Sequence, residues 1–153
     1  MESAGRRQLA LVNDILDMSK LESGKFSINE IPYDLMVLVT EVEHMLSAYA
    51  KDSGLDFVIT QKSDEPYLLI GDGQRIGQIL INLIGNAIKF TEKGKVKLTV
   101  WNNQNYLFFN VEDTGIGMAP DTIDKLFERF EQIDGAISRR FGGSGLGLFI
   151  SEN

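Results

Sequence analysis

The sequence of 153 residues contains no cysteine and a single histidine, His44. The lack of cysteine excludes disulfides, thiolate zinc sites and cysteine nucleophiles, and it fits a reducing compartment. One histidine supplies neither a histidine-rich metal site nor, with its neighbours here, a Ser/His/Asp set. His44 lies on a predicted helix between acidic and apolar neighbours, and we interpret it as a structural residue at or near the surface.

Long hydrophobic runs and an excess of positive charge are also missing. No apolar run approaches the roughly 20 residues of a membrane span, and the N-terminal sequence MESAGRRQLA lacks the apolar core of a signal peptide. The net charge of −7 argues against a nucleic-acid partner, which needs clustered lysine and arginine. A hydrophobic content of 43% and a charged content of 24% are typical of a globular protein, so we expect one cytoplasmic α/β domain with a single core.

Helical and strand patterns follow one another along most of the chain. Helices are predicted at 4–22, 35–52, 71–91 and 120–130, with a last one from about 144. Strands are predicted at 26–33, 55–61, 67–70, 95–101 and 106–112. Asp34 and Asp72 are the expected N-caps of their helices, and Gly54 is an expected helix stop. The order predicts an α/β (α+β sandwich) domain, a mixed sheet with helices on one face, rather than a doubly wound fold.

The stretch at 71–91, GDGQRIGQILINLIGNAIKFT, carries the first candidate site. At about 100° per residue, its apolar side chains predict a buried stripe: Ile76, Ile79, Leu80, Leu83, Ala87 and Phe90. A second set, the polar line, falls within an arc of about 80° on another side: Arg75, Gln78, Asn82, Asn86 and Lys89. Amide oxygens in line with a cation suit a metal ion and phosphate oxygens. The alternative is the solvated side of an ordinary amphipathic helix.

Two glycine-rich motifs follow. DTGIGM at 113–118 comes directly after a hydrophobic strand, so Asp113 can accept a hydrogen bond from an exocyclic amine such as that of adenine. GGSGLGL at 142–148 opens the last helix, whose exposed N–H groups suit phosphate. Neither motif fits GxxxxGK[ST] or GxGxxG. Each one alone is also compatible with a simple glycine-rich turn.

The segment between these motifs combines aromatic residues, charge and glycine. FERF at 127–130 and SRRF at 138–141 bracket a loop that could fold over a nucleotide, with an arginine reaching its phosphates. The alternative is a solvated loop with two aromatic anchors.

Taken in order, the Asn-Asn-Lys helix, DTGIGM, FERFEQ and GGSGLGL resemble the ATP-binding catalytic domain of sensor histidine kinases, in the gyrase, Hsp90, histidine kinase and MutL ATPase superfamily. LVNDILDMSKLESGKF resembles the end of the dimerisation helix and the linker of hybrid sensor kinases. The resemblance implies a Bergerat-type ATP-binding fold at 26–153, preceded at 1–25 by that helix end and linker. Family domains continue after GLGL with two closing strands, so the resemblance implies a chain that lacks its last strands.

The resemblance also implies a site for ATP and Mg²⁺. In the polar line, Asn86 is similar to the Mg²⁺ ligand, while Asn82 and Lys89 are similar to the catalytic residues at the phosphates. The other positions implied to bind ATP belong to DTGIGM, to a mobile lid over about 118–142 and to the start of the last helix: Asp113, Gly115, Gly117, Phe127, Arg129, Gly143, Gly145, Leu146 and Gly147.

Asn82 bears on the reaction. Hydrolytic members of the superfamily carry Glu at this position, four residues before the metal-binding Asn, whereas an amide cannot act as a general base. The resemblance therefore implies protein-histidine kinase activity in two-component signalling rather than hydrolysis. The family's His-Glu-Leu-Arg-like phosphoacceptor motif does not occur here, and His44 lies in the wrong domain for that role.

The implied partners are a histidine-bearing dimerisation domain of the same or a partner kinase, a downstream receiver domain and a second copy in a homodimer. The full-length protein would be cytoplasmic or anchored in the inner membrane through upstream segments. Two alternatives stay open: a fragment that binds nucleotide but is inactive, and a module that only mediates interactions.

Overall fold

The computed structural model describes residues 19, 27–62, 68–103 and 105–119. Ser19 is helical, but the rest of the helix predicted at 4–22 lies outside the described residues, as do the helix predicted at 120–130 and the one expected from about 144. Residues Asn29–Gly117 form one compact unit, to which all the elements below belong.

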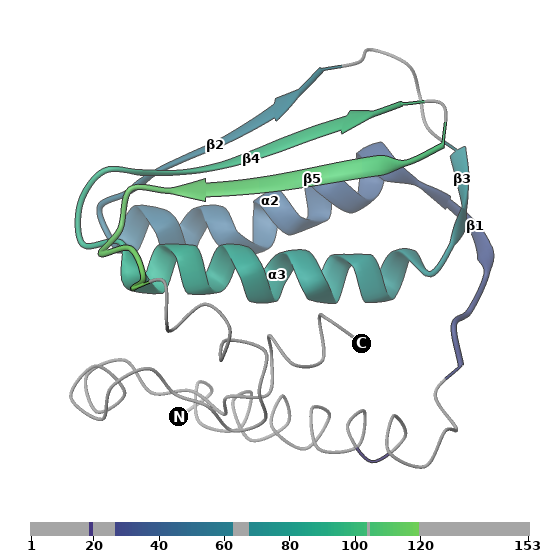
Figure 1. The fold of residues 1–153 in the computed structure, drawn as a ribbon, viewed down its shortest axis with the longest axis horizontal. Helices are drawn as coiled ribbons and strands as arrows, with labels where there is room; N and C mark the ends of the chain where they lie inside the picture. The colour runs from purple at the N-terminus through teal and green to yellow at the C-terminus, as the bar shows by residue number, and fades with distance from the viewer. Residues whose placement is uncertain (1–18, 20–26, 63–67, 104, 120–153) are drawn as a thin grey trace. The chain divides into compact units, whose positions relative to one another are not determined.

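This unit follows the predicted order of strand, helix, two strands, helix and two further strands (Figure 1). Its elements are β1 (Ile31–Asp34), α2 (Leu35–Asp52), β2 (Asp56–Gln61), β3 (Leu68–Gly71), α3 (Gly73–Phe90), β4 (Lys95–Asn102) and β5 (Leu107–Asp113). Among the described residues, no helix is both long and apolar enough to cross a bilayer.

The main sheet has the strand order β2–β4–β5, and α2 and α3 cover one of its faces (Figure 1). β2 runs parallel to β4, while β4 and β5, predicted as strands at 95–101 and 106–112, form an antiparallel hairpin. The predicted mixed sheet with helices on one face is therefore confirmed. β1 and β3 form a separate antiparallel pair, which the hydrophobic pattern did not distinguish from the main sheet.

Both predicted ends of α2 are confirmed. The Asp34 carboxylate accepts hydrogen bonds from two N–H groups of the first turn, at 2.8 and 3.2 Å. At the other end, Gly54 has a φ of 72°, and the Leu55 N–H donates to the Ala50 carbonyl at 3.0 Å. This is the glycine-dependent ending that leaves Leu55 buried against the helix it follows.

Asp34→Ala is expected to lower the free energy of unfolding by about 1 kcal/mol, because it removes the acceptor for the first turn of α2. Urea denaturation followed by circular dichroism measures the change. Glu41→Ala, at an exposed position within the same helix, serves as the control and should change stability by less than about 0.5 kcal/mol. Equal losses in the two variants would contradict the capping role.

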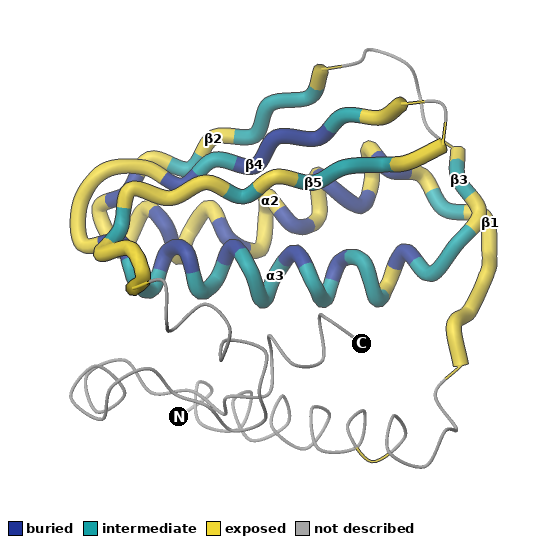
Figure 2. Tube along the Cα trace, in the orientation of Figure 1, coloured by how far each residue is buried: buried dark blue, intermediate teal, exposed yellow. Residues whose placement is uncertain are grey.

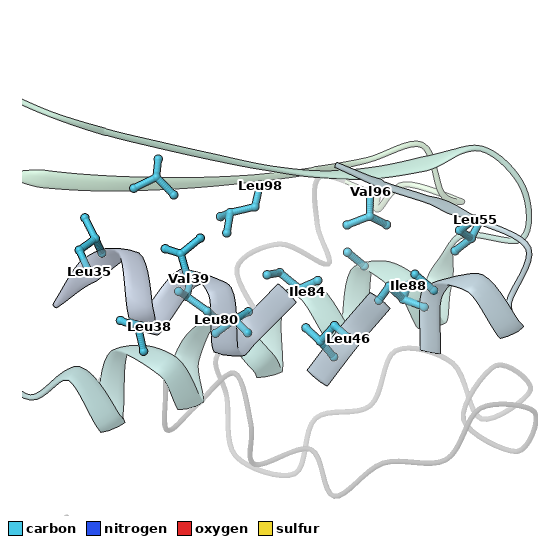
Figure 3. Packing of buried hydrophobic residues seen from close by; sticks show 14 residues of the cluster. Leu35, Leu38, Val39, Leu46, Leu55, Leu80, Ile84, Ile88, Val96 and Leu98 are labelled. Atoms are coloured by element: carbon cyan, nitrogen blue, oxygen red, sulfur yellow. The ribbon is translucent and has the colours of Figure 1, made fainter. Parts of the chain in front are cut away.

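The core lies between the helices and the sheet (Figures 2 and 3). Leu35, Ile84, Val96 and Leu98 are completely buried there. The inward side of β4 supplies every second residue of that strand to the core, as expected for a strand with one covered face.

The buried stripe predicted for α3 is partly wrong. Of its six residues, only Leu80 and Ala87 are buried, and the other four are half-buried. The observed buried line is made of Gly73, Gly77, Leu80, Ile84, Ala87 and Ile88.

Two glycines explain this difference. A Cβ atom at Gly73 would lie 2.9 Å from the Tyr33 ring, and one at Gly77 would lie 3.0 Å from Leu38 Cδ1. The helix thus packs closely through positions that have no side chain. A hydrophobic pattern counts only large apolar residues and gives glycine no weight. The predicted stripe is therefore rotated about the helix axis, away from this contact.

Two smaller predictions also need correction. The strand predicted at 26–33 is shorter in the structure: only β1 is a strand, and 27–30 have no regular structure. The four residues of β3 are all paired with β1, so β3 has no further residue with which 27–30 could pair. The helical spacing of the apolar residues in α2 predicts Tyr49 on its buried side, but Tyr49 is 45% exposed. Ala50 is buried instead, one turn beyond Leu46.

Candidate nucleotide-binding site

The polar line of α3 lies on the side of the helix opposite its buried line, as its spacing requires. All five of its residues are half-buried rather than fully exposed. In the first part of the line, Arg75 Nη1 donates a hydrogen bond to Gln78 Oε1 at 2.9 Å. Asn82, Asn86 and Lys89 continue the line through the C-terminal half of the helix, each about one turn from the next.

Lys89 is the cation at the end of this line. Its Nζ lies 4.8 Å from the centroid of the Phe90 ring, and burial lowers the pKa of its ammonium group from the usual value. A partly desolvated ammonium group gains more from a nearby anion than a fully hydrated one does. The position is therefore suited to a phosphate oxygen.

Asp113 is the last residue of β5 and pairs with Val96 of β4. Side chains alternate between the two faces of the sheet along β5, so Asp113 is on the same face as Phe109 and Val111. These two residues pack against the core between the sheet and the helices. Its carboxylate is nevertheless exposed, and Oδ1 accepts a hydrogen bond from the Gly115 N–H at 2.8 Å. An acid at the end of a strand on the helix side can reach a ligand seated near α3.

The turn after Asp113 rests directly on the C-terminal end of α3. The Ile116 N–H donates to the Phe90 carbonyl at 3.2 Å. A Cβ atom at Gly115 would collide with that carbonyl and would lie 2.9 Å from Thr91 Oγ1, so no larger residue fits. Gly117 has a φ of 67°, and a Cβ atom built there would meet nothing within 4 Å. The structure thus brings Asp113, Gly115 and Gly117 to the end of the helix that carries the polar line.

The remaining predicted site residues lie outside the described residues: Phe127, Arg129, Gly143, Gly145, Leu146 and Gly147. Their roles stay predictions. His44 is exposed on α2, in agreement with its interpretation as a surface residue.

Sequence reasoning missed three residues that build the turn: Thr91, Gly94 and Thr114. Thr91 is buried at the C-cap of α3, and its hydroxyl donates to the Ala87 carbonyl at 2.7 Å. Thr114 was included in DTGIGM only as part of a turn. The one available signal was a hydroxyl-bearing residue directly after the candidate acid.

The donor set fits Mg²⁺ held jointly with a nucleotide. Within the described ranges, no group of three or more His, Cys, Asp or Glu residues could hold a metal ion. Mg²⁺ does not need such a cage, because it usually keeps several waters and binds one or two protein oxygens together with phosphates. The amide oxygen of Asn86 would be the protein ligand, and Lys89 would stand near the phosphates.

Residues 71–153 match the family described as histidine kinase-, DNA gyrase B- and HSP90-like ATPases. The chain belongs to this family. The matched region contains α3, with the polar line, and the DTGIGM turn, so the family assignment and the site geometry concern the same part of the molecule.

One relative of this chain is the signal transduction histidine-protein kinase BarA of Escherichia coli. The two sequences are 42% identical, and the match covers 99% of the chain and 17% of BarA. The hybrid signal transduction histidine kinase K of Dictyostelium discoideum is 39% identical over 98% of the chain and 13% of that protein. The chain therefore spans less than a fifth of either relative. In the crystal structure of full-length ShkA in complex with AMPPNP, the match has 36% identity and a TM-score of 0.81, over 97% of the chain and 30% of ShkA.

Proposed function

We propose that this chain binds Mg-ATP and donates the γ-phosphate to a histidine on a phosphoacceptor domain in two-component signalling. The observation that carries the proposal is the contact of the DTGIGM turn with the C-terminal end of α3. This contact brings Asp113 to the end of the helix that carries the polar line. The matching structure of ShkA was determined in complex with AMPPNP, a non-hydrolysable ATP analogue, which supports a nucleotide as the ligand of this chain.

Each described residue has a chemical task in this proposal. Asp113 accepts from the exocyclic amine of adenine, Gly115 lets the turn pack on the end of α3, and Gly117 leaves room for the base to approach the backbone. Asn86 holds the metal, and Lys89 contacts a phosphate with Asn82 one turn before Asn86. Mg²⁺, when bound, neutralises charge on the phosphates. Since Asn82 has no carboxylate to activate water, the chain favours a protein acceptor over hydrolysis.

The proposal extends to residues outside the described ranges. Phe127 and Arg129 would belong to a lid over the nucleotide, and the helix start with Gly143, Gly145, Leu146 and Gly147 would bind its phosphates. Residues 1–25 would be the end of a dimerisation helix and linker, and residues 26–153 the catalytic domain. The name of the Dictyostelium relative as a hybrid kinase supports a receiver domain as a further partner. The proposal also includes assembly as a homodimer in the cytoplasm.

Transfer of the labelled γ-phosphate from ATP to the dimerisation domain tests the proposed kinase reaction. The chain is mixed with γ-labelled ATP, Mg²⁺ and the separately produced histidine-bearing dimerisation domain of the same kinase. We expect acid-labile label on that domain, and none when its acceptor histidine is replaced by glutamine. Release of free phosphate without labelled protein would favour an ATPase. Binding of nucleotide without either product would favour the inactive alternative.

Lys89→Gln is expected to weaken ATP binding about tenfold or more, because it removes one charge-assisted contact to phosphate. Binding of adenosine, which has no phosphate, should not change. Lys62→Gln is the matched control, since Lys62 Nζ also lies over an aromatic ring, 5.4 Å from that of Trp101, but on the far face of the sheet. Isothermal calorimetry with both ligands measures the effect. Equal weakening of ATP and adenosine would contradict a phosphate-contacting role.

The pH dependence of stability provides a second readout for Lys89. Because its pKa is lowered in the folded state, the folded chain releases this proton at a lower pH than the unfolded chain. The contribution of Lys89 to stability should therefore rise as the pH increases from the lowered value toward the usual one. Lys89→Gln should remove this part of the rise, as measured by urea denaturation at a series of alkaline pH values.

A further inference from the structure

The side chain of Thr114 is bound to the connection between α3 and β4. Its Oγ1 accepts a hydrogen bond from the Lys95 N–H at 3.0 Å. The same oxygen lies 3.4 Å from the carbonyl oxygens of Lys93 and Lys95, to either of which it can donate. The Thr114 N–H also donates to the Lys95 carbonyl at 3.2 Å. Backbone and side chain together thus fix this residue to a segment about twenty positions earlier in the chain.

Gly94 makes room for this hydroxyl group. Its φ is 119°, a conformation that L side chains rarely adopt. A Cβ atom at this position would collide with Thr114 Oγ1. The connection before β4 is therefore shaped around the hydroxyl, and the contact is not an incidental one at the surface.

Asp113 lies immediately before this attachment point. Its exposed carboxylate accepts from the Gly115 N–H, so the direction of the carboxylate depends on where residues 114 and 115 sit. Gly115 and Ile116 are fixed to the end of α3, and Thr114 is fixed to the start of β4. Removing the Thr114 hydroxyl would loosen the attachment to β4, where the backbone hydrogen bond from the Thr114 N–H to the Lys95 carbonyl would remain, and would leave the attachment to α3 in place.

We propose that Thr114 is a positioning residue for base selectivity, whose hydroxyl holds the Asp113 carboxylate in the direction that recognises the exocyclic amine of adenine. The inference rests on the proposed function. It adds a residue that does not touch the nucleotide but sets how well the adenine-binding acid discriminates between bases. Discrimination of this kind requires a fixed acceptor, because a mobile carboxylate can turn to water instead.

The ratio of the dissociation constants for ATP and inosine triphosphate tests this role. Inosine triphosphate carries an oxygen where adenine carries the amine. We expect the full chain to prefer ATP, and Thr114→Val to weaken ATP binding roughly three- to tenfold, the range for one hydrogen bond, with inosine triphosphate unaffected. Thr114→Ser keeps the hydroxyl and should restore the preference. A Thr114→Val variant with an unchanged ratio would overturn the inference.

Controls separate positioning from general loss of structure. Thr40→Val removes a hydroxyl that donates to the Met36 carbonyl at 2.8 Å on α2, and it should leave the ratio unchanged. If Thr114→Val does not fold, Gly94→Ala displaces the same hydroxyl and should raise the same ratio, because it weakens ATP binding and leaves the binding of inosine triphosphate unchanged. Equal weakening of both nucleotides by a folded variant would overturn the positioning role. Failure of the unmodified chain to bind either nucleotide would overturn the proposed function itself.

Discussion

Asn86→Ala is expected to abolish the effect of Mg²⁺ on nucleotide binding. With the amide oxygen removed, the affinity for an ATP analogue in Mg²⁺ should fall to the value measured with a chelator. The loss should be on the order of a hundredfold, because removing even an outer-shell partner of a metal ligand usually costs ten- to a hundredfold. The reason lies in the donor set: in the described part of the chain no acidic or histidine cluster could hold the ion in place of Asn86. Calorimetric titrations with and without Mg²⁺ measure the difference.

Asn110→Ala is the matched control for this experiment. Asn110 is an exposed asparagine in β5, paired with Thr99 of β4, and it belongs to no predicted site. This variant should bind the analogue as the unmodified chain does and should keep the full Mg²⁺ effect. If Asn86→Ala also kept the Mg²⁺ effect, its assignment as the metal ligand would be wrong.

Leu98→Ala is expected to cost about 2–5 kcal/mol of stability, a large part of the total for a small domain. Leu98 is completely buried in the central strand of the main sheet (Figure 3). It pairs with Ile59 of β2 on one side and with Val111 of β5 on the other. Its removal leaves a cavity that the surrounding side chains only partly fill. Urea denaturation should show a lower midpoint with a similar slope.

Leu68→Ala provides the comparison, because Leu68 is 76% exposed on β3 and should lose less than about 0.5 kcal/mol. The Leu98 variant should still bind nucleotide where it remains folded, since Leu98 belongs to the core and not to the polar line. A loss for Leu98→Ala no larger than that for Leu68→Ala would contradict the assignment of the core.

The sequence predicted those features that depend on neighbouring residues. Asp34 as the cap of α2 and Gly54 as its end follow from local hydrogen bonding and backbone conformation. The position of the polar line on α3 follows from helix geometry alone. For this reason the predicted bounds of α2 agree with the observed helix, and those of α3 differ by only one or two residues.

Features that depend on contacts between distant segments could not be predicted in this way. Gly73 and Gly77 define the buried side of α3, yet a glycine adds nothing to a hydrophobic pattern. The contact of Thr114 with the backbone of Lys93 and Lys95 joins positions about twenty residues apart. Neither periodicity nor motif spacing contains this information, because it arises only when β5 is paired with β4.

The separate pairing of β1 with β3 has the same origin. Both strands have only four residues, and β3 carries apolar side chains on its exposed positions as well, Leu68 and Ile70, so its sequence does not show which face is covered. In their register Tyr33 lies opposite Leu69, and the Tyr33 ring lies against Gly73 at the start of α3. The hydrophobic pattern predicted two strands here but not their partners.

The most direct test of this account is a calorimetric titration of the 153-residue chain with a non-hydrolysable ATP analogue in the presence of Mg²⁺. We predict saturable binding of one nucleotide per chain, which weakens when Mg²⁺ is chelated and when Asp113 is replaced by alanine. Circular dichroism on the same sample establishes that the chain is folded. A folded chain that shows no saturable binding of the analogue would contradict the assignment of the polar line and Asp113 as an ATP site.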